Sequence, residues 1–220
     1  MQRSDGVRVV DLAHSIREGM PVYPGTDGPV IAVANSHKEH GFRESRISFH
    51  SHTGTHIDPP VHIIEGAKTL DAFAAADFIG RGIVIDCREV GEGGEIGVDI
   101  LACYSDKLDG CDFILFCTGW DKLWGTEAYF WKYPVLSRDA LEYVISLGCK
   151  GIGFDTASLD PVSDANLTCH KLLFSSSDII NIENLRGLDE LIGESFTLCC
   201  LPLKVECSDG APARAVAIID

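Results

Sequence analysis

The chain has 220 residues, of which 45% are hydrophobic and 23% charged, a composition that indicates one large folded domain and excludes disordered, collagen-like and coiled-coil proteins. Its 18 lysine and arginine residues against 33 aspartate and glutamate residues give a formal net charge of −15 at pH 7. Because so acidic a surface repels phosphate backbones and anionic lipids, we expect neither nucleic acid nor a membrane as partner.

Segments typical of strands and of helices alternate along the chain without internal repeats or an obvious linker. In chain order, we expect strands over 7–12, 31–36 and 44–51, a short helix over 69–78, a strand over 82–86, a helix over 98–102, a strand over 112–118, a helix over 137–148, strands over 151–155 and 179–182, a short helix over 185–192, and strands over 196–203 and 213–219. The helix over 137–148 is the clearest, because Ser137 is a good N-cap and Gly148 a typical terminator. Since strands outnumber long helices and their order is no strict βαβα series, we predict a single α/β domain over residues 1–220 with a mixed β-sheet, not a Rossmann fold.

The nine cysteines form no CxxC pair, and most stand among apolar neighbours, as in Leu198-Cys199-Cys200-Leu201. Neither a secretory signal nor the ~20 apolar residues of a membrane span is recognisable in the sequence. We therefore predict reduced cysteines that pack as small core residues of a cytoplasmic protein. The alternative for these cysteines is a thiolate zinc site or a redox pair.

Four of the eight histidines fall within residues 50–62, which read His50-Ser-His-Thr-Gly-Thr-His-Ile-Asp-Pro-Pro-Val-His62. Judged from residue frequencies, the spacing of His52, His56, Asp58 and His62 arises by chance in roughly one chain in a thousand. A cluster this improbable indicates a site with a chemical task.

The spacing of this cluster requires a bend if its side chains are to meet. On an extended strand, residues two apart share a face about 6.6 Å apart, so His56 and Asp58 can bind one ion together. His52 would lie ~13 Å from His56 along a straight strand, too far for ligands about 2.0–2.2 Å from a single metal. A helix is disfavoured by Thr-Gly-Thr and by the two prolines that follow. We therefore predict a sharp bend at Gly54, a residue that tolerates positive φ, which brings two imidazoles and a carboxylate to one point.

Two imidazoles and a carboxylate suit a borderline divalent ion such as Zn²⁺ or Mn²⁺. Three protein ligands that leave a coordination position open are typical of a catalytic rather than a structural metal site. His62 follows the two prolines just beyond this set, and a histidine that titrates near neutrality is a natural general acid or base. Two other interpretations of the cluster stay open from the residues alone: surface histidines without a metal, and a purely structural metal clip.

The stretch His52-Thr-Gly-Thr-His-Ile-Asp-Pro-Pro-Val-His62 closely resembles the signature of the cyclase-like metal-dependent hydrolases, a family that includes bacterial kynurenine formamidase and isatin hydrolase. Weaker landmarks occur in the expected order over most of the chain: Met20-Pro-Val-Tyr-Pro-Gly25, Thr118-Gly-Trp120, Gly153-Phe-Asp-Thr156, His170-Lys-Leu-Leu173, Ile182-Glu-Asn-Leu185 and Gly210-Ala-Pro-Ala-Arg214. The resemblance implies a compact domain of the swivelling β/β/α type that assembles as a homodimer or homotetramer.

The resemblance also implies roles for the residues of the signature. It implies that His52, His56 and Asp58 bind metal and that Asp58 can bridge two ions. It implies that His62 is the catalytic proton shuttle.

Two later residues enter through the resemblance alone. His170 and Glu183 stand where the two-metal formamidases have a further histidine and glutamate ligand, so one or two ions are expected. From the residues alone, His170 is interpreted as a helix-surface histidine and Glu183 as a carboxylate that caps a following helix. The sequence departs from the formamidases at Tyr23, where they usually have a pocket-lining tryptophan.

These inferences lead to one hypothesis, the hydrolysis of a small amide, formamide, or cyclic imide or lactam by metal-activated water with His62 as general acid or base. Tyr23, Phe42 and Trp120 are predicted to wall an aromatic-sized substrate pocket, with core packing as the alternative for each. Two other functions remain: a non-catalytic metal- or metabolite-binding protein with the same ligand set, and a thiol hydrolase that uses Cys169.

Overall fold

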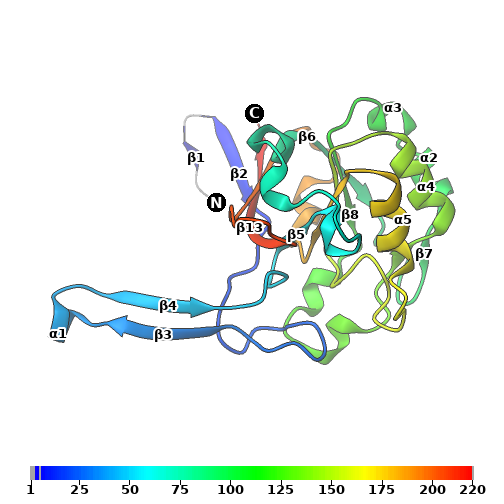
Figure 1. Cartoon of the computed structure of the whole chain (residues 1–220). Coiled ribbons are helices and arrows are strands. Elements are labelled where there is room, and N and C mark those ends of the chain that lie inside the picture. Colours follow the sequence, from blue (N-terminus) through cyan, green and yellow to red (C-terminus); the bar gives the residue numbers. More distant parts are fainter. Residues whose placement is uncertain (1–2, 5, 220) are drawn as a thin grey trace.

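Strand segments from the whole length of the chain meet in one nine-stranded mixed sheet (Figure 1). The computed structural model describes residues 3–4 and 6–219. In spatial order, the sheet contains β1 (Arg3–Ser4), β2 (Val7–Asp11), β13 (Ala211–Ile219), β12 (Phe196–Pro202), β6 (Ile79–Asp86), β8 (Phe113–Cys117), β10 (Gly151–Phe154), β11 (Ile180–Glu183) and β5 (His56–Asp58). The neighbours from β6 to β11 run parallel and the other pairs run antiparallel. The predicted single α/β domain with a mixed sheet is confirmed.

The short strand β5 closes this sheet into a barrel. It pairs antiparallel with β11 on one side and with β13 on the other, so the strands from β13 round to β5 form a closed ring. Its central residue, Ile57, is fully buried in an apolar cluster. Since side chains alternate along a strand, His56 and Asp58 point to the opposite face. Closure of the ring therefore fixes the direction of two predicted metal ligands.

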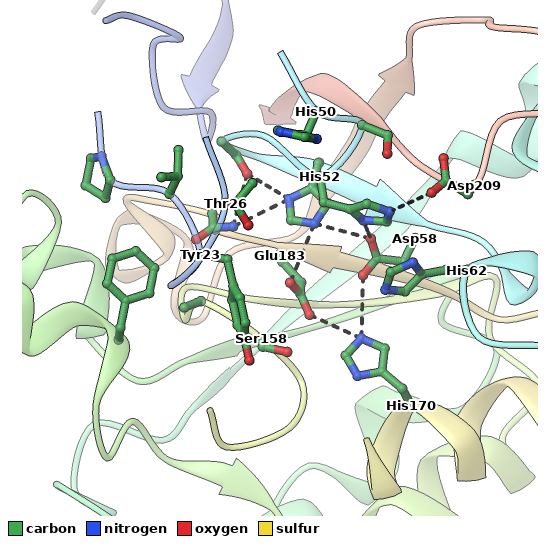
Figure 2. Close-up of a pocket in the computed structure, with 18 of the residues that line it drawn as sticks. Tyr23, Thr26, His50, His52, Asp58, His62, Ser158, His170, Glu183 and Asp209 are labelled. Atoms are coloured by element: carbon green, nitrogen blue, oxygen red, sulfur yellow. Dashed lines mark hydrogen bonds and ion pairs between the residues drawn. The ribbon is translucent and has the colours of Figure 1, made fainter. Parts of the chain in front are cut away.

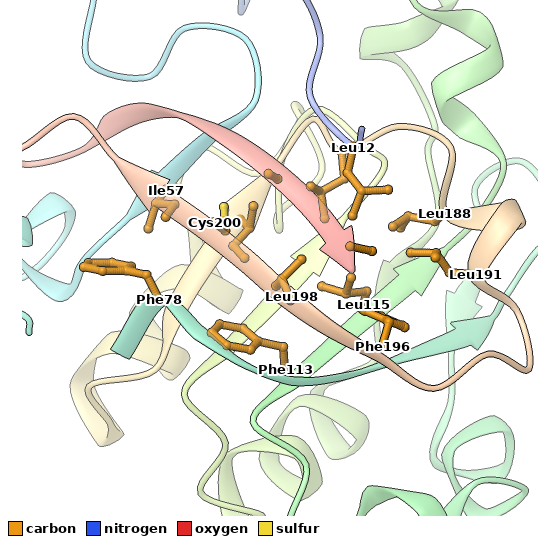
Figure 3. Packing of buried hydrophobic residues seen from close by; sticks show 14 of the residues in the cluster. Leu12, Ile57, Phe78, Phe113, Leu115, Leu188, Leu191, Phe196, Leu198 and Cys200 are labelled. Atoms are coloured by element: carbon orange, nitrogen blue, oxygen red, sulfur yellow. The ribbon is translucent and has the colours of Figure 1, made fainter. Parts of the chain in front are cut away.

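Two apolar clusters lie on the two faces of the sheet. Strand β8 shows the division, because Phe113, Leu115 and Cys117 belong to the first cluster, whereas Ile114 and Phe116 belong to the second. The first cluster draws side chains from every strand of the closed ring except β10, and it fills the inner face of the ring (Figure 3). The second lies between the sheet and the helices. A strand buried on both faces reads as a continuous apolar run, which made this one recognisable in the sequence.

Helices cover the outer face of the sheet (Figure 1). Four α-helices of the described chain lie there: α2 (Val98–Ala102), α3 (Ser105–Leu108), α4 (Arg138–Ser146) and α5 (Thr168–Ser176). The short helix α1 (His37–His40) lies away from the sheet. Helix α4 packs against both α2 and α5, and all three bury apolar residues in the second cluster. None of the described helices is both long and apolar enough to cross a membrane.

The predicted helix over 69–78 is wrong. The structure has two short 3₁₀ turns there, Leu70–Ala72 and Ala75–Phe78, with extended backbone at the two residues between them. Leu70 and Phe78 are both buried in the first cluster. Packing against the barrel, rather than local helix propensity, therefore sets the path of this segment.

The helix expected over 185–192 is also shorter than predicted, a 3₁₀ turn over Leu188–Leu191 that follows Gly187 in the left-handed conformation. The predicted strands and the other two helices are present, with ends shifted by up to about three residues as is usual. The remaining short elements are β7 (Glu95–Ile96), β9 (Val135–Leu136) and 3₁₀ turns at Pro60–His62, Trp120–Leu123 and Glu127–Phe130.

Strands β3 (Val30–Asn35) and β4 (Glu44–Ser48) form a separate two-stranded ribbon that projects from the body of the protein, with α1 at its tip (Figure 1). The ribbon exposes apolar side chains, including Phe42, which is 52% exposed. The expected assembly into a homodimer or homotetramer stays a prediction.

Helix α4 offers a test of the capping prediction. The Oγ of Ser137 accepts a hydrogen bond from the Ala140 N–H at 3.2 Å, so we expect Ser137→Ala to lower the free energy of unfolding by about 1 kcal/mol. Ser146→Ala, at the exposed last turn of the same helix, is the matched control and should change it by much less. Urea denaturation measures both variants, and equal effects would contradict the capping role.

Candidate active site

The polypeptide turns sharply at Gly54 and brings the first two predicted histidine ligands together. Gly54 has a φ of +64°, and a Cβ there would lie 3.3 Å from the Met20 side chain. Glycine is therefore favoured at position 54, because its φ is positive and because a larger residue would crowd Met20. The ring centroids of His52 and His56 lie 5.2 Å apart. The predicted bend at Gly54 is confirmed.

Asn184, just after β11, holds this corner in place. Its Nδ2 donates to the Gly54 carbonyl at 3.0 Å, and its Oδ1 accepts from the Tyr129 hydroxyl at 2.8 Å. The Nδ1 of His56 lies 2.8 Å from the same Gly54 carbonyl and is held there as the donor. A histidine held in this way presents its other nitrogen, Nε2, to a metal or a carboxylate.

Strands β5 and β11 place four polar side chains on one face. In their antiparallel register, His56 lies opposite Glu183 and Asp58 lies opposite Asn181. Residues two apart on a strand share a face, so all four side chains point to the same side, where all four are buried. Sequence reasoning missed Asn181, although its spacing of two residues from Glu183 is the signal that linked His56 to Asp58.

His170 approaches this face from helix α5. Its Nδ1 lies 2.6 Å from Oδ2 of Asp160, a carboxylate that also accepts the backbone N–H groups of Cys169 and His170. Its Nε2 lies 3.4 Å from Glu183 Oε1 and 3.6 Å from Asp58 Oδ2. The interpretation of His170 as a surface histidine is therefore wrong, because the ring is buried and aimed inward.

Glu183 does not cap a helix either. Its Oε1 accepts the backbone N–H of Leu159 at 2.9 Å, and its Oε2 lies 3.6 Å from His56 Nε2. The carboxylate thus faces the predicted ligands.

The predicted ligands converge on two adjoining points that share Asp58 (Figure 2). Asp58 Oδ1 lies 2.6 Å from His52 Nδ1 and 3.2 Å from His56 Nε2, whereas its Oδ2 faces His170. Ligand atoms lie within 4.8 Å of one another in each of three groups: His52 with His56 and Asp58, Asp58 with His170 and Glu183, and His52 with His62 and Asp209. The metal-binding roles stay predictions, and these side chains are arranged as the roles require.

His62 lies beside the first group, at the end of the 3₁₀ turn Pro60–His62. Its ring centroid is 4.0 Å from that of His52 and 5.8 Å from that of His170. The His52 ring in turn packs on Gly210, where a Cβ would come within 2.5 Å of it. Asp209 Oδ2 lies 3.4 Å from His52 Nε2. The loop that leads into β13 therefore helps to orient His52, a contribution that the sequence pattern did not reveal.

The ionisable groups of the site depend on one another. Burial opposes the charge on Asp58, but His56 and His52 outweigh it and hold its pKa well below the usual range. Burial also opposes the charge on His56, yet Asp58 and Glu183 raise its pKa to about 9. Burial lowers the pKa of His62. Among the described residues that line the cavity there is no lysine or arginine, so histidines or a bound cation must balance the buried carboxylates.

The site opens into a cavity of about 430 Å³, a volume suited to a small molecule. Of the three aromatic residues predicted to wall the pocket, Tyr23 lines this cavity. Phe42 lies on the projecting ribbon, and Trp120 uses its indole N–H to bind a main-chain carbonyl at 3.0 Å. The structure thus corrects two of the three assignments, and Trp124 and Phe130 provide the aromatic wall instead.

The structure does not support the thiol alternative. No cysteine is among the described residues that line the cavity, and burial raises the pKa of the Cys169 thiol to about 12. A thiol with so high a pKa is protonated at neutral pH and is a poor nucleophile. All nine cysteines are free, as predicted, but only five of them are buried, and Cys103 and Cys207 are exposed rather than packed in the core.

His14 packs against the aromatic wall. Its ring is stacked on Trp124 with centroids 3.9 Å apart and planes 11° apart. Its Nε2 is buried without a hydrogen-bond partner in the described structure. Burial, with a smaller contribution from Arg186, lowers the pKa of His14 to about 4.

This lowered pKa predicts a pH-dependent stability. Between pH 6.5 and 4 the unfolded chain binds a proton at His14 that the folded chain excludes, so the contribution of His14 to stability is lost as pH falls through this window. His14→Phe keeps the stacking and removes the titration. Because solvent reaches part of the ring, we expect the free energy of unfolding of the parent, relative to this variant, to drop by about 1–2 kcal/mol from pH 7.5 to pH 4.5. Urea denaturation in the presence of a chelator measures the difference, and a constant offset between the two proteins would contradict it.

Several known proteins resemble this chain over nearly its whole length. A kynurenine formamidase from Erythrobacter litoralis is 28% identical over 95% of this chain and 93% of its own. Isatin hydrolase A from Labrenzia aggregata, solved with benzyl benzoate bound, has a TM-score of 0.87 at 25% identity and covers 97% of this chain and 94% of its own. The solved structure of a potential metal-dependent hydrolase with cyclase activity has a TM-score of 0.81 at 30% identity, over 98% of this chain and 99% of its own. The family model described as putative cyclase matches residues 10–161, more than half of the chain, and the chain therefore belongs to the putative cyclase family.

Proposed function

We propose that this protein is a metal-dependent hydrolase that cleaves the C–N bond of a small amide, formamide, cyclic imide or lactam. The observation that supports this most strongly is the convergence of His52, His56 and Asp58, with His62 beside them, at one cavity. The similarity to a kynurenine formamidase and to an isatin hydrolase supports an amidohydrolase as well.

The side chains of the site fit a divalent cation such as Zn²⁺ or Mn²⁺. Asp58 and Glu183 are buried carboxylates, and a cation between them would offset the cost of their burial. His56 and His170 each have Nδ1 held by an oxygen and Nε2 turned toward these carboxylates, which is the arrangement of metal-binding histidines. Imidazole and carboxylate donors without a thiolate suit zinc or manganese.

The two groups of side chains would hold different ions. His52, His56 and Asp58 would hold one, and Asp58, His170 and Glu183 would hold a second. Divalent ions in such sites supply an activated water and polarise the carbonyl of the substrate.

The residues of the chain would move the proton and orient the metal-binding histidines. His62, whose ring stands beside His52 in the cavity, would accept a proton from the attacking water. It would then donate this proton to the leaving nitrogen as the C–N bond breaks. Asp160 and the Gly54 carbonyl keep His170 and His56 in their orientations throughout.

The cavity favours an uncharged aromatic substrate. Tyr23, Trp124 and Phe130 offer flat apolar surface. No lysine or arginine among the described lining residues is available to pair with a substrate carboxylate. An aryl formamide or an aromatic cyclic imide or lactam combines a flat ring with the amide that the proposed reaction requires.

The proposed roles of His62 and His52 predict two distinguishable losses. His62→Gln should keep the bound metal but lower kcat at least about 100-fold, because the proton transfer is lost. His52→Ala should lower the metal content and the activity together. Elemental analysis and a hydrolysis assay on isatin and on formanilide, an uncharged aryl formamide, with zinc- or manganese-loaded protein, measure both effects.

His37→Gln, on the exposed helix α1 of the ribbon, is the matched control and should keep both metal and activity. If His62→Gln hydrolyses these substrates as fast as the parent, the proposed proton transfer is wrong. If the metal-loaded parent binds substrate without turnover, the protein is a binding protein of this fold instead.

A further inference from the structure

Asn181 faces the second group of predicted ligands. It lies on β11, directly opposite Asp58, and its side chain is fully buried. Its amide nitrogen lies 3.0 Å from Asp58 Oδ2, 2.9 Å from Glu183 Oε1 and 3.5 Å from His170 Nε2. One end of this amide is therefore within reach of all three side chains.

The four atoms are spaced like the ligands of one ion. His170 Nε2 lies 3.4 Å from Glu183 Oε1 and 3.6 Å from Asp58 Oδ2, so the distances that involve His170 or Asn181 run from 2.9 to 3.6 Å. Ligands about 2.0–2.2 Å from a tetrahedral ion lie about 3.3–3.6 Å apart, and those of an octahedral ion lie about 2.8–3.1 Å apart. The end of the Asn181 side chain thus stands where a fourth ligand would stand.

The two ends of this amide have different environments. The Nδ2 of Asn181 donates one hydrogen bond to Asp58 and one to Glu183, whereas its Oδ1 is buried without a partner among the described residues. A half-turn of the amide exchanges its nitrogen and oxygen with almost no change of shape. Because Oδ1 has no partner in the described part of the chain, the half-turn breaks no hydrogen bond on that side. It places an oxygen against two carboxylates, which only a cation between them would stabilise.

We propose that the amide oxygen of Asn181 is a metal ligand, which closes the position formed by Asp58, His170 and Glu183 with a fourth protein donor. The inference rests on the proposed metal-dependent function and extends it to a residue outside the predicted ligand set. The Asn181 side chain would then have two states. Without an ion its amide nitrogen donates hydrogen bonds to the carboxylates, and with an ion its amide oxygen is a ligand.

This assignment gives the two positions different tasks. Four protein donors are typical of a closed structural ion, whereas three protein donors leave room for water or substrate. The open position is the one formed by His52, His56 and Asp58, and it is also the one beside His62. An ion at the closed position would hold Asp58 in place, and the open position beside His62 would be left for the reaction.

Cobalt(II) binding tests the assignment, because its visible absorption reports the coordination number. In a His52→Ala background only the closed position remains, and we expect it to bind one cobalt ion per chain. Adding Asn181→Leu should weaken this binding at least about tenfold and change the spectrum, since one ligand is lost. Asn181→Asp keeps an oxygen at the same place and should keep both the affinity and the coordination number. Ile182→Val, on the opposite face of the same strand, controls for lost stability and should keep the cobalt spectrum.

The following results would contradict the assignment of Asn181. Unchanged cobalt affinity and spectrum in Asn181→Leu would overturn the assignment. If that variant does not fold, a crystal structure of the cobalt-loaded parent decides: the Asn181 amide oxygen should lie about 2.0–2.3 Å from the ion, and a separation beyond about 3 Å overturns the assignment. Cobalt binding and hydrolysis with Asn181 away from the ion would leave the proposed function intact, whereas a parent that binds no cobalt would overturn both.

Discussion

The carboxylate of Asp58 is buried between histidines that come from separate parts of the chain, and the arrangement of the site depends on how its charge is balanced. Asp58 is only 1% exposed. Its Oδ1 faces His52 and His56, and its Oδ2 faces His170 and Asn181. A buried carboxylate destabilises a protein unless cations or hydrogen-bond donors surround it. The histidines and Asn181 around Asp58 therefore have to keep fixed positions, and the surrounding fold holds them there rigidly.

The rigidity comes from the closure of the barrel. Strand β5 has only three residues, yet it pairs with β11 and with β13. Ile57 on its inner face is buried in the apolar cluster, so the pairing of β5 fixes the outer face as the side on which His56 and Asp58 lie. Gly54 and Asn184 fix the corner that precedes the strand. The short strand β5 thus contributes one face to the hydrophobic interior of the barrel and the other face to the polar site.

Much of the site could be predicted from the sequence because its central residues are close together in the chain. The bend at Gly54 followed from the spacing of His52 and His56, which no straight strand brings to one ion. His170 and Glu183 are more than a hundred residues away, so their approach to Asp58 depends on the tertiary fold and only the family resemblance indicated it.

Other features of the molecule could not be predicted from the sequence, for physical reasons. The helix predicted over 69–78 has suitable local propensity, but packing on the barrel divides it into two turns. Phe42 was assigned to the pocket as an aromatic residue, and no sequence signal indicates that it lies on a projecting ribbon. Asn181 was the one missed residue with a usable signal, since it alternates with Glu183 on a strand.

The most direct test of the account is metal binding to a variant that lacks the shared carboxylate. Calorimetric titration of chelator-treated protein with zinc should show binding to the parent and at least about tenfold weaker binding at both proposed positions in folded Asp58→Ala, because each of these positions loses a ligand. If Asp58→Ala keeps its circular dichroism spectrum and binds as many zinc ions as the parent with similar affinity, this carboxylate does not organise the site and the account is wrong.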